Sequence, residues 1–231
     1  MRSFKGRSLG ILVAAGLVLP LSFATPRERI NSVDGLSYVW IEPGSYFTGC
    51  VPRDSECIGR ERPRQRIVIE KGFWIGRTEV TQTAYQRVMI SNPSRYRGSE
   101  LPVEQVDWDS AQRYCTAVGM RLPTESEWEF AALGGMDGPR YGPLESIAWY
   151  DSNSNDQTHP VGQKMPNAYG LFDMLGNVWE WVSAPSLTVT DRRIMKGGSF
   201  YNLARNLRVA ERETPLHTMR HRNVGFRCAA D

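Results

Sequence analysis

The sequence is poor in side chains that hold transition metals, with only three histidines and four cysteines among 231 residues. No two cysteines stand in the Cys-x-x-Cys spacing of common zinc sites, so structural zinc is only the runner-up to disulfide bonding. His217 and His221 are four residues apart, as two metal ligands on one helix face would be. They follow Thr214-Pro215 and have Arg220 between them, which favours an exposed loop over a metal site.

Long apolar runs are also missing, apart from one near the N-terminus. It extends from Leu9 to Phe23, follows three basic residues, and has the small residues Ser22 and Ala24 at the cleavage positions. This is the pattern of a secretory signal peptide, and the run is shorter than the about 20 residues that span a bilayer. We therefore expect a signal peptide over 1–24, a flexible mature N-terminus over 25–35 and one domain over 36–231. The protein is expected to be periplasmic or secreted, without a stable membrane anchor.

The expected mature chain has a formal net charge of zero. The formal charge of the whole sequence is +3, and Arg2, Lys5 and Arg7 of the expected signal peptide account for all of it. A chain without bulk charge is not drawn onto nucleic acid or an anionic membrane. Nucleic acid is therefore not an expected partner.

The four cysteines are Cys50, Cys57, Cys115 and Cys228. An even number behind a signal peptide favours disulfide bonds, although four cysteines allow three pairings. The short spacing suggests that Cys50 pairs with Cys57 across a polar loop. Cys115 and Cys228 then pair by elimination.

Regular secondary structure is expected mainly in the first 134 residues. Aromatic and β-branched residues predict strands over 36–42, 66–71 and 72–75. Thr81 and Asp107 are candidate N-caps of two helices, and Thr124 forms a capping box with Glu127 at the start of a third. Beyond Gly134, glycine, proline, asparagine and aspartate dominate without periodicity. The sequence therefore predicts an irregular α+β domain with little regular secondary structure.

Eight short motifs stand in an order that resembles the formylglycine-generating enzyme family, also called sulfatase-modifying factors. The resemblance extends from about Tyr38 to Cys228 and implies that family's fold, a variant of the C-type lectin fold. The most specific of these motifs are Arg121-Leu-Pro-Thr-Glu, Gly176-Asn-Val-Trp-Glu-Trp181, Lys196-Gly-Gly-Ser199 and Asn223-Val-Gly-Phe-Arg-Cys228.

The family resemblance also implies roles for cysteines. Its Tyr-Cys helix and its Gly-Phe-Arg-Cys end are joined by a disulfide, which supports a Cys115–Cys228 bond. Its oxygen-dependent enzymes bind copper through two cysteines that follow the Gly-Gly-Ser turn, and the matching positions here are Asn202 and Leu207. Copper(I) selects soft thiolates. Copper is therefore not an expected cofactor, and no catalytic residue is assigned.

A structural calcium site is implied at the Gly176-Asn177 turn. The family's ligands there correspond to the side chains of Asp173 and Glu180 and the backbone carbonyls of Gly176 and Val178, an oxygen set that suits calcium. The alternative is that the two carboxylates only cap local turns. A second oxygen-rich stretch, 151–158, aligns poorly with the family's other calcium site and is equally well a solvated loop.

The resemblance places Ser199, Asn202, Asn223 and Trp179 along a substrate groove, although each could equally have a structural role. Nine lysines and arginines between Arg192 and Asp231 add a basic tail, which either recognises a partner or binds the domain's own acidic loops. We expect the groove and tail to bind a protein or peptide, with a glycan as an alternative ligand. The tail also resembles variable regions of retroelement-diversified proteins. The alternative function is an oxidoreductase of the formylglycine-generating or non-heme metal type.

Overall fold

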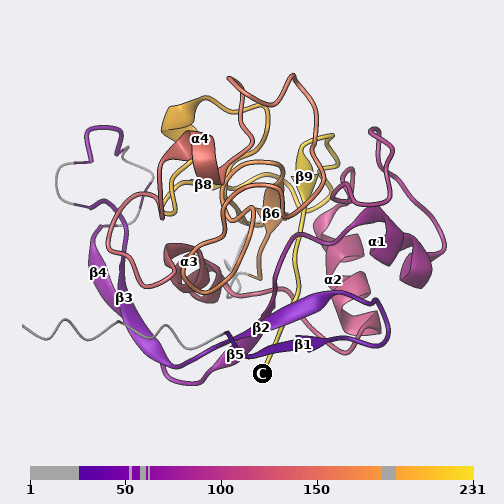
Figure 1. Cartoon of the computed structure of the whole chain (residues 1–231), viewed down its shortest axis with the longest axis horizontal. Coiled ribbons are helices and arrows are strands. Elements are labelled where there is room, and N and C mark those ends of the chain that lie inside the picture. The colour runs from indigo at the N-terminus through magenta and orange to yellow at the C-terminus, as the bar shows by residue number, and fades with distance from the viewer. Residues whose placement is uncertain (1–25, 52–53, 58–60, 62, 184–190) are drawn as a thin grey trace, which may run out of the picture.

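The computed structural model describes residues 26–51, 54–57, 61, 63–183 and 191–231 (Figure 1). The expected signal peptide, 1–24, lies outside these residues. In the described segments, small sheets and short helices are linked by long irregular stretches, as predicted for this α+β domain. The helices are α1 (Gln82–Met89), α2 (Trp108–Ala117), α3 (Glu125–Leu133) and α4 (Leu144–Ile147), with a 3-10 turn at Ala204–Asn206. The strands are β1 (Glu28–Ile30), β2 (Ser37–Ile41), β3 (Gly44–Thr48), β4 (Gln65–Ile69), β5 (Phe73–Gly76), β6 (Trp179–Trp181), β7 (Met195–Lys196), β8 (Arg212–Glu213), β9 (Val224–Gly225) and β10 (Ala229–Ala230).

The three longer helices begin where their capping residues predict. The Thr81 hydroxyl accepts a hydrogen bond from the backbone N–H of Ala84, and the Asp107 carboxylate accepts one from Ser110. Both bonds of the Thr124–Glu127 capping box are present. Such bonds satisfy backbone N–H groups that the first helical turn leaves unpaired. None of the helices in the described segments is long and apolar enough to cross a bilayer.

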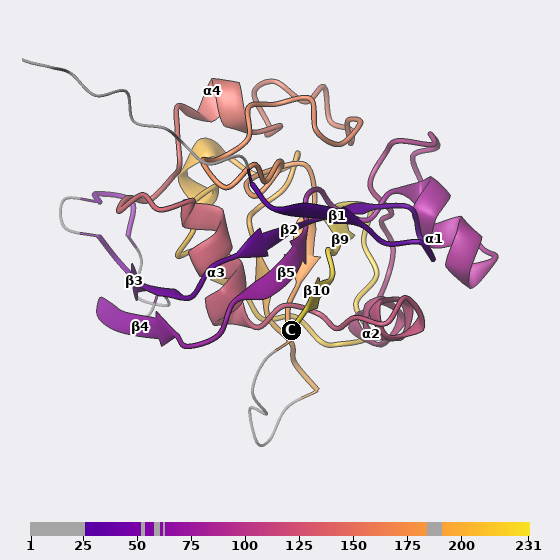
Figure 2. The same cartoon turned by 60° about the horizontal axis from the view of Figure 1, so that its bottom comes forward.

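The antiparallel sheet β1-β2-β5-β10 separates two hydrophobic cores. Val39 and Ile41 of β2 belong to the core that contains α3, whereas Tyr38 of the same strand belongs to the core of α1 and α2. Because successive side chains of a strand face opposite sides of the sheet, one strand contributes to both cores. Figure 2 shows α3 and α2 at the two ends of this sheet. The β3–β4 hairpin lies beside α3 (Figures 1 and 2).

A second four-stranded sheet, in the order β8-β7-β6-β9, is built from the C-terminal half of the chain. Strand β6 pairs antiparallel with β7 and parallel with β9. All three residues of β6 are buried, and Trp181 Nε1 donates a hydrogen bond to the carbonyl of Val106. The Cys115–Cys228 disulfide joins α2 to the chain end beyond β9. This sheet therefore fixes the Gly-Gly-Ser turn and the C-terminal motif relative to each other.

The prediction of a flexible N-terminus over 25–35 is wrong for the residues of β1. Strand β1 pairs with β2 in antiparallel register, with Glu28 opposite Val39. The guanidinium of Arg29 lies 4.2 Å from the ring centroid of Trp74, and that of Arg27 lies 5.4 Å from that of Trp40. These cation–π contacts hold a polar segment that has no hydrophobic pattern of its own.

Candidate functional site

A pocket of about 320 Å³ opens beside the central strand β6. Its buried wall consists of Trp179 from β6 and Met195 from β7, which are 4% and 3% exposed. Met219 adds a second thioether, while the exposed side chains of Arg192 and His221 lie at the polar edge. Thioethers adapt to irregular apolar surfaces, so this wall suits an apolar side chain of variable shape.

A chain of hydrogen bonds runs from the edge of this pocket to the Gly-Gly-Ser turn. Asn223 Nδ2 donates to Ser199 Oγ over 2.9 Å, and the Ser199 hydroxyl donates to Asn202 Oδ1 over 2.6 Å. At the other end, Asn223 Oδ1 is bonded to Nδ1 of His221. The backbone N–H of Trp179 donates to the carbonyl of Asn223 over 2.8 Å. The four residues predicted to lie along a groove are thus linked by hydrogen bonds, but only Trp179 and Asn223 line the pocket, and Ser199 is fully buried.

The two positions that correspond to the family's cysteine pair have different environments. Asn202 is half-buried and bonded to Ser199, whereas Leu207 is fully buried in the core that contains α3. All four cysteines of the sequence form disulfides, Cys50 with Cys57 and Cys115 with Cys228. Both bonds follow the predicted pairing. The fold therefore leaves no thiol to take the place of the missing pair.

The expected calcium ligands lie around a tight turn. Asp173, Gly176 and Asn177 all have positive φ, and a Cβ at Gly176 would lie 2.3 Å from the carbonyl oxygen of Trp149. Only glycine fits such a close approach. Asp173 is buried, and its Oδ2 accepts a hydrogen bond from Gly162 over 2.7 Å. Its Oδ1 has no hydrogen-bond partner among the described residues. Burial raises the pKa of Asp173 to about 6.

The carboxylate of Glu180, the other expected calcium ligand, already accepts hydrogen bonds at both oxygens. Arg227 Nε donates to both of its oxygens, over 3.0 and 2.7 Å, and Arg227 Nη2 donates to Oε1 over 2.7 Å. Trp128 Nε1 donates to Oε2 over 2.7 Å. A carboxylate offers about four lone-pair positions, and all are engaged here. The expected role of Glu180 as a calcium ligand is therefore corrected, because Arg227 balances its charge and its oxygens are already engaged.

A third buried carboxylate, Glu79, supports the same turn. It accepts hydrogen bonds from the Asn177 amide over 2.8 Å and from the backbone N–H of Val178 over 3.1 Å. Burial, together with repulsion from Asp173 and Glu180, raises the pKa of Glu79 well above its ordinary value. Sequence reasoning missed Glu79, because nothing local indicates that it reaches a turn about one hundred residues away.

The second oxygen-rich stretch, 151–158, makes several contacts within the protein. Asp156 pairs with Arg222 over 3.0 Å, and the Ser154 hydroxyl donates to the carbonyl of Phe200 over 2.8 Å. Asn153 accepts a hydrogen bond from the backbone of Tyr150. These contacts give Asn153, Ser154 and Asp156 partners within the protein, whereas Thr158 Oγ1 is buried without a hydrogen-bond partner among the described residues.

The basic tail is largely neutralised by the domain's own carboxylates, the second of its two predicted roles. Six of its nine cations pair with acidic residues within the described part of the chain. These pairs are Lys196–Glu129, Arg208–Asp54, Arg212–Glu125, Arg220–Asp107, Arg222–Asp156 and Arg227–Glu180. Lys196, Arg208 and Arg227 are fully buried. These three cations cannot meet a partner at the surface, and recognition by the exposed part of the tail stays a prediction.

The histidines do not meet at a metal site in the described structure. His217 Nδ1 lies 2.8 Å from an oxygen of Asp109, while His221 bonds to Asn223. Both lie outside helices, as predicted, but sequence reasoning missed the place of His221 at the pocket edge. The spacing His221-x-Asn223 could have indicated this position, because the side chains of two loop residues separated by one residue can form a hydrogen bond with each other.

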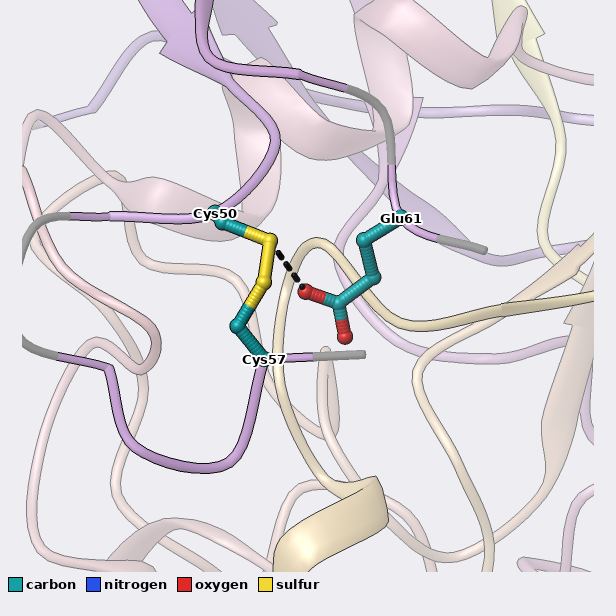
Figure 3. A group of neighbouring side chains, drawn as sticks. All are labelled: Cys50, Cys57 and Glu61. Carbon is teal, nitrogen blue, oxygen red and sulfur yellow. Dashed lines mark hydrogen bonds between the residues drawn. A yellow bond between two sulfur atoms is a disulfide. The ribbon is translucent and has the colours of Figure 1, made fainter. Parts of the chain in front are cut away.

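Cys50, Cys57 and Glu61 are the one group of three metal-ligand side chains that converges within the described segments (Figure 3). Cys50 Sγ lies 3.3 Å from Glu61 Oε2, but both sulfur atoms are joined in the disulfide. Glu61 is paired with Arg208. These residues therefore crosslink the polar loop, covalently through the disulfide and ionically through the Glu61–Arg208 pair.

Several known proteins resemble this chain. The family described as sulfatase-modifying factor enzyme 1-like domain matches residues 23–231. Chaperone protein LppX of Paenibacillus barcinonensis is 32% identical, and the match covers 55% of this chain and 69% of LppX. Inactive C-alpha-formylglycine-generating enzyme 2 of Mus musculus is 38% identical, over 57% of this chain and 49% of its own length. The chain therefore spans about half of the mouse protein.

A solved structure extends the likeness over most of the domain. Treponema denticola variable protein 1 has a TM-score of 0.77 and 27% identity to this chain, covering 89% of this chain and 99% of that structure. The irregular α+β architecture with short sheets is thus shared with a solved structure that aligns over nearly its whole length.

Proposed function

We propose that this chain, which belongs to the family of sulfatase-modifying factor enzyme 1-like domains, binds a protein or peptide segment and does not generate formylglycine by copper chemistry. One observation carries this proposal: the cysteine-pair positions hold a buried Leu207 and a hydrogen-bonded Asn202, and every cysteine is in a disulfide. The similarity to an inactive formylglycine-generating enzyme and to a chaperone protein supports it.

The side chains at these two positions do not suit copper-dependent oxidation. Copper(I) requires soft ligands, and the side chains of Asn202 and Leu207 supply an amide and a hydrocarbon. The side-chain amide oxygen of Asn202 accepts a hydrogen bond from the Ser199 hydroxyl, and the side chain of Leu207 is buried in the core. Neither side chain can hold the metal or transfer an electron from a substrate thiol.

The pocket beside β6 has the properties of a peptide-binding site. Trp179, Met195 and Met219 form an apolar wall for one anchoring side chain, since interfaces depend mainly on buried aromatic and apolar anchors. Asn223 and His221 supply polar groups at the edge, where a peptide backbone needs partners. Arg192 and Glu213 add one charge of each sign, which would fix the direction of a bound segment.

We also propose that the protein is exported and holds one calcium ion. Two disulfides indicate an oxidising compartment, and the N-terminal pattern over 1–24 supports secretion. The unpaired, buried Oδ1 of Asp173 supports calcium, with the carbonyls of Gly176 and Val178 as further ligands. Bound there, the ion would hold the turn that precedes β6.

A paired experiment tests the binding role against the oxidase role. The mature protein, loaded with copper(I), is incubated under oxygen with a Cys-x-Pro-x-Arg peptide, and thiol loss is followed by mass spectrometry. We expect no aldehyde product; turnover would establish the oxidoreductase alternative instead.

In parallel, binding peptides are selected from a displayed library and measured by fluorescence polarisation. Met219→Glu places a charge in the pocket and should weaken binding by tenfold or more. Met165→Glu is the matched control, because Met165 is 62% exposed and lies outside the pocket. Equal peptide affinity in the two variants would contradict binding in this pocket and indicate another binding surface.

A further inference from the structure

A second, larger pocket lies on another part of the molecule, between the β3–β4 hairpin and the C-terminal end of α3. Its volume is about 500 Å³, within the range of small-molecule sites. None of its lining residues belongs to the pocket beside β6. Figures 1 and 2 show the hairpin and α3 side by side. Gly44 permits this approach, since a Cβ there would lie 2.7 Å from the Phe130 ring.

Five aromatic side chains line this pocket. The ring centroids of Tyr46 and Phe130 are 5.8 Å apart, and those of Phe130 and Tyr169 are 6.1 Å apart, so three rings form a continuous wall. Phe47 and Trp40 also line the pocket. Phe47 is 45% exposed, which is a large solvent-facing area for a phenylalanine. The ring faces carry negative electrostatic potential that attracts cations.

The charged side chains of the pocket are all acidic. Glu42 and Asp137 line it, whereas no lysine, arginine or histidine does. Asp137 accepts hydrogen bonds from Arg64 Nη2 over 3.0 and 2.8 Å. Glu42 is exposed and makes no hydrogen bond or ion pair with any described residue. One carboxylate beside an aromatic wall is therefore available to a ligand.

The surrounding contacts show that these rings accept cations. The guanidinium of Arg64 lies 4.5 Å from the centroid of Phe47, and that of Arg27 lies 5.4 Å from the centroid of Trp40. Aromatic surfaces with a nearby carboxylate are the usual means of binding quaternary ammonium groups. Arg64 balances Asp137, whereas Glu42 has no ion-pair partner among the described residues and would repel an anionic ligand.

We infer that this pocket binds a small organic cation, of the quaternary ammonium or alkylamine class. Its apolar body would contact the wall of Tyr46, Phe130 and Tyr169, and its cationic end would lie beside Glu42, since Arg64 already lies over the Phe47 ring. The inference is independent of peptide binding beside β6, because the two pockets share no residue.

Acetylcholine serves as the probe, with 3,3-dimethylbutyl acetate as its uncharged isostere, and both are titrated by NMR against the full-length mature protein. We expect saturable shifts confined to this pocket, with the isostere binding roughly fivefold or more weakly. Glu42→Gln should weaken acetylcholine binding by a similar factor. Glu100→Gln, which removes an exposed glutamate outside the pocket, should leave it unchanged.

The controls distinguish the alternatives. Equal binding of acetylcholine and its isostere, or unchanged affinity in Glu42→Gln, would overturn the inference and leave a merely apolar pocket. Equal weakening in Glu100→Gln would also overturn it, because the attraction would then come from overall charge.

Discussion

Arg227 and Glu180 form an ion pair that is closed to solvent on both sides, with Arg227 Nη2 2.7 Å from Glu180 Oε1. Arg227 also donates hydrogen bonds to the carbonyls of Gly76 and Phe172, over 3.0 and 2.9 Å. The pair thus connects the first sheet, the second sheet and the loop before the Gly176 turn. Two residues that are 47 positions apart in sequence organise the centre of the domain.

Replacing Glu180 by Gln should strongly destabilise the protein. The change leaves the Arg227 charge buried without its partner, which costs about 3–5 kcal/mol. Urea denaturation measures the loss of unfolding free energy. The control is Glu28→Gln, which breaks a half-exposed pair with Arg77 and should cost less than about 1 kcal/mol. Similar losses in both variants would contradict the central role of the buried pair.

The two disulfides should contribute unequally to stability. The Cys115–Cys228 bond closes a loop with a sequence separation of 113, and the Cys50–Cys57 bond one of 7. From loop-closure entropy, removing the first should cost about 5 kcal/mol and removing the second about 2 kcal/mol. The double variants Cys115→Ala with Cys228→Ala, and Cys50→Ala with Cys57→Ala, are compared by thermal unfolding. A larger loss from the short loop would show that its native contacts outweigh chain entropy.

Glu104 should make stability fall as the pH rises. It is fully buried, its Oε2 has no hydrogen-bond partner among the described residues, and burial raises its pKa to about 7. The protonated form is therefore favoured in the folded state. Its contribution is fully present below the unfolded-state pKa of about 4.3 and is lost as the pH rises through 7.

Glu104→Gln removes this titration and should flatten the stability profile between pH 5 and 8. At pH 8 the variant should exceed the natural protein by about 1–3 kcal/mol, and at pH 5 the two should be similar. Urea denaturation at several pH values provides the profile. Glu100→Gln, at an exposed position, should keep the original slope. An unchanged slope in Glu104→Gln would assign the pH dependence to another group.

Calcium should raise the melting temperature, because an ion that binds only the folded state stabilises it. At one hundred times its dissociation constant the gain is about 2.7 kcal/mol. Asp173→Ala should abolish the difference between calcium and EGTA, while Asp151→Ala, in the second oxygen-rich stretch, should preserve it. Differential scanning fluorimetry is sufficient. Identical melting curves in calcium and EGTA would rule out the site.

The sequence by itself determined what depends on neighbouring residues. The helices at Thr81, Asp107 and Thr124 start where predicted, because each capping side chain bonds to a backbone N–H only three positions ahead. The predicted strands formed as β2, β4 and β5, since runs of aromatic and β-branched residues favour extended backbone in a sheet. The ordered motifs fixed the family for the same reason, as each is a short run of contiguous residues.

Only the tertiary structure decided which distant groups meet. It paired the basic tail with carboxylates, brought Ser199 to Asn223, and assembled an aromatic wall from β3, α3 and Tyr169. It also made a strand of β1, whose exposed residues carry no pattern and are held by rings of β2 and β5. Ion pairs and aromatic contacts depend on distance in space, which a sequence reveals only where the chain is locally regular.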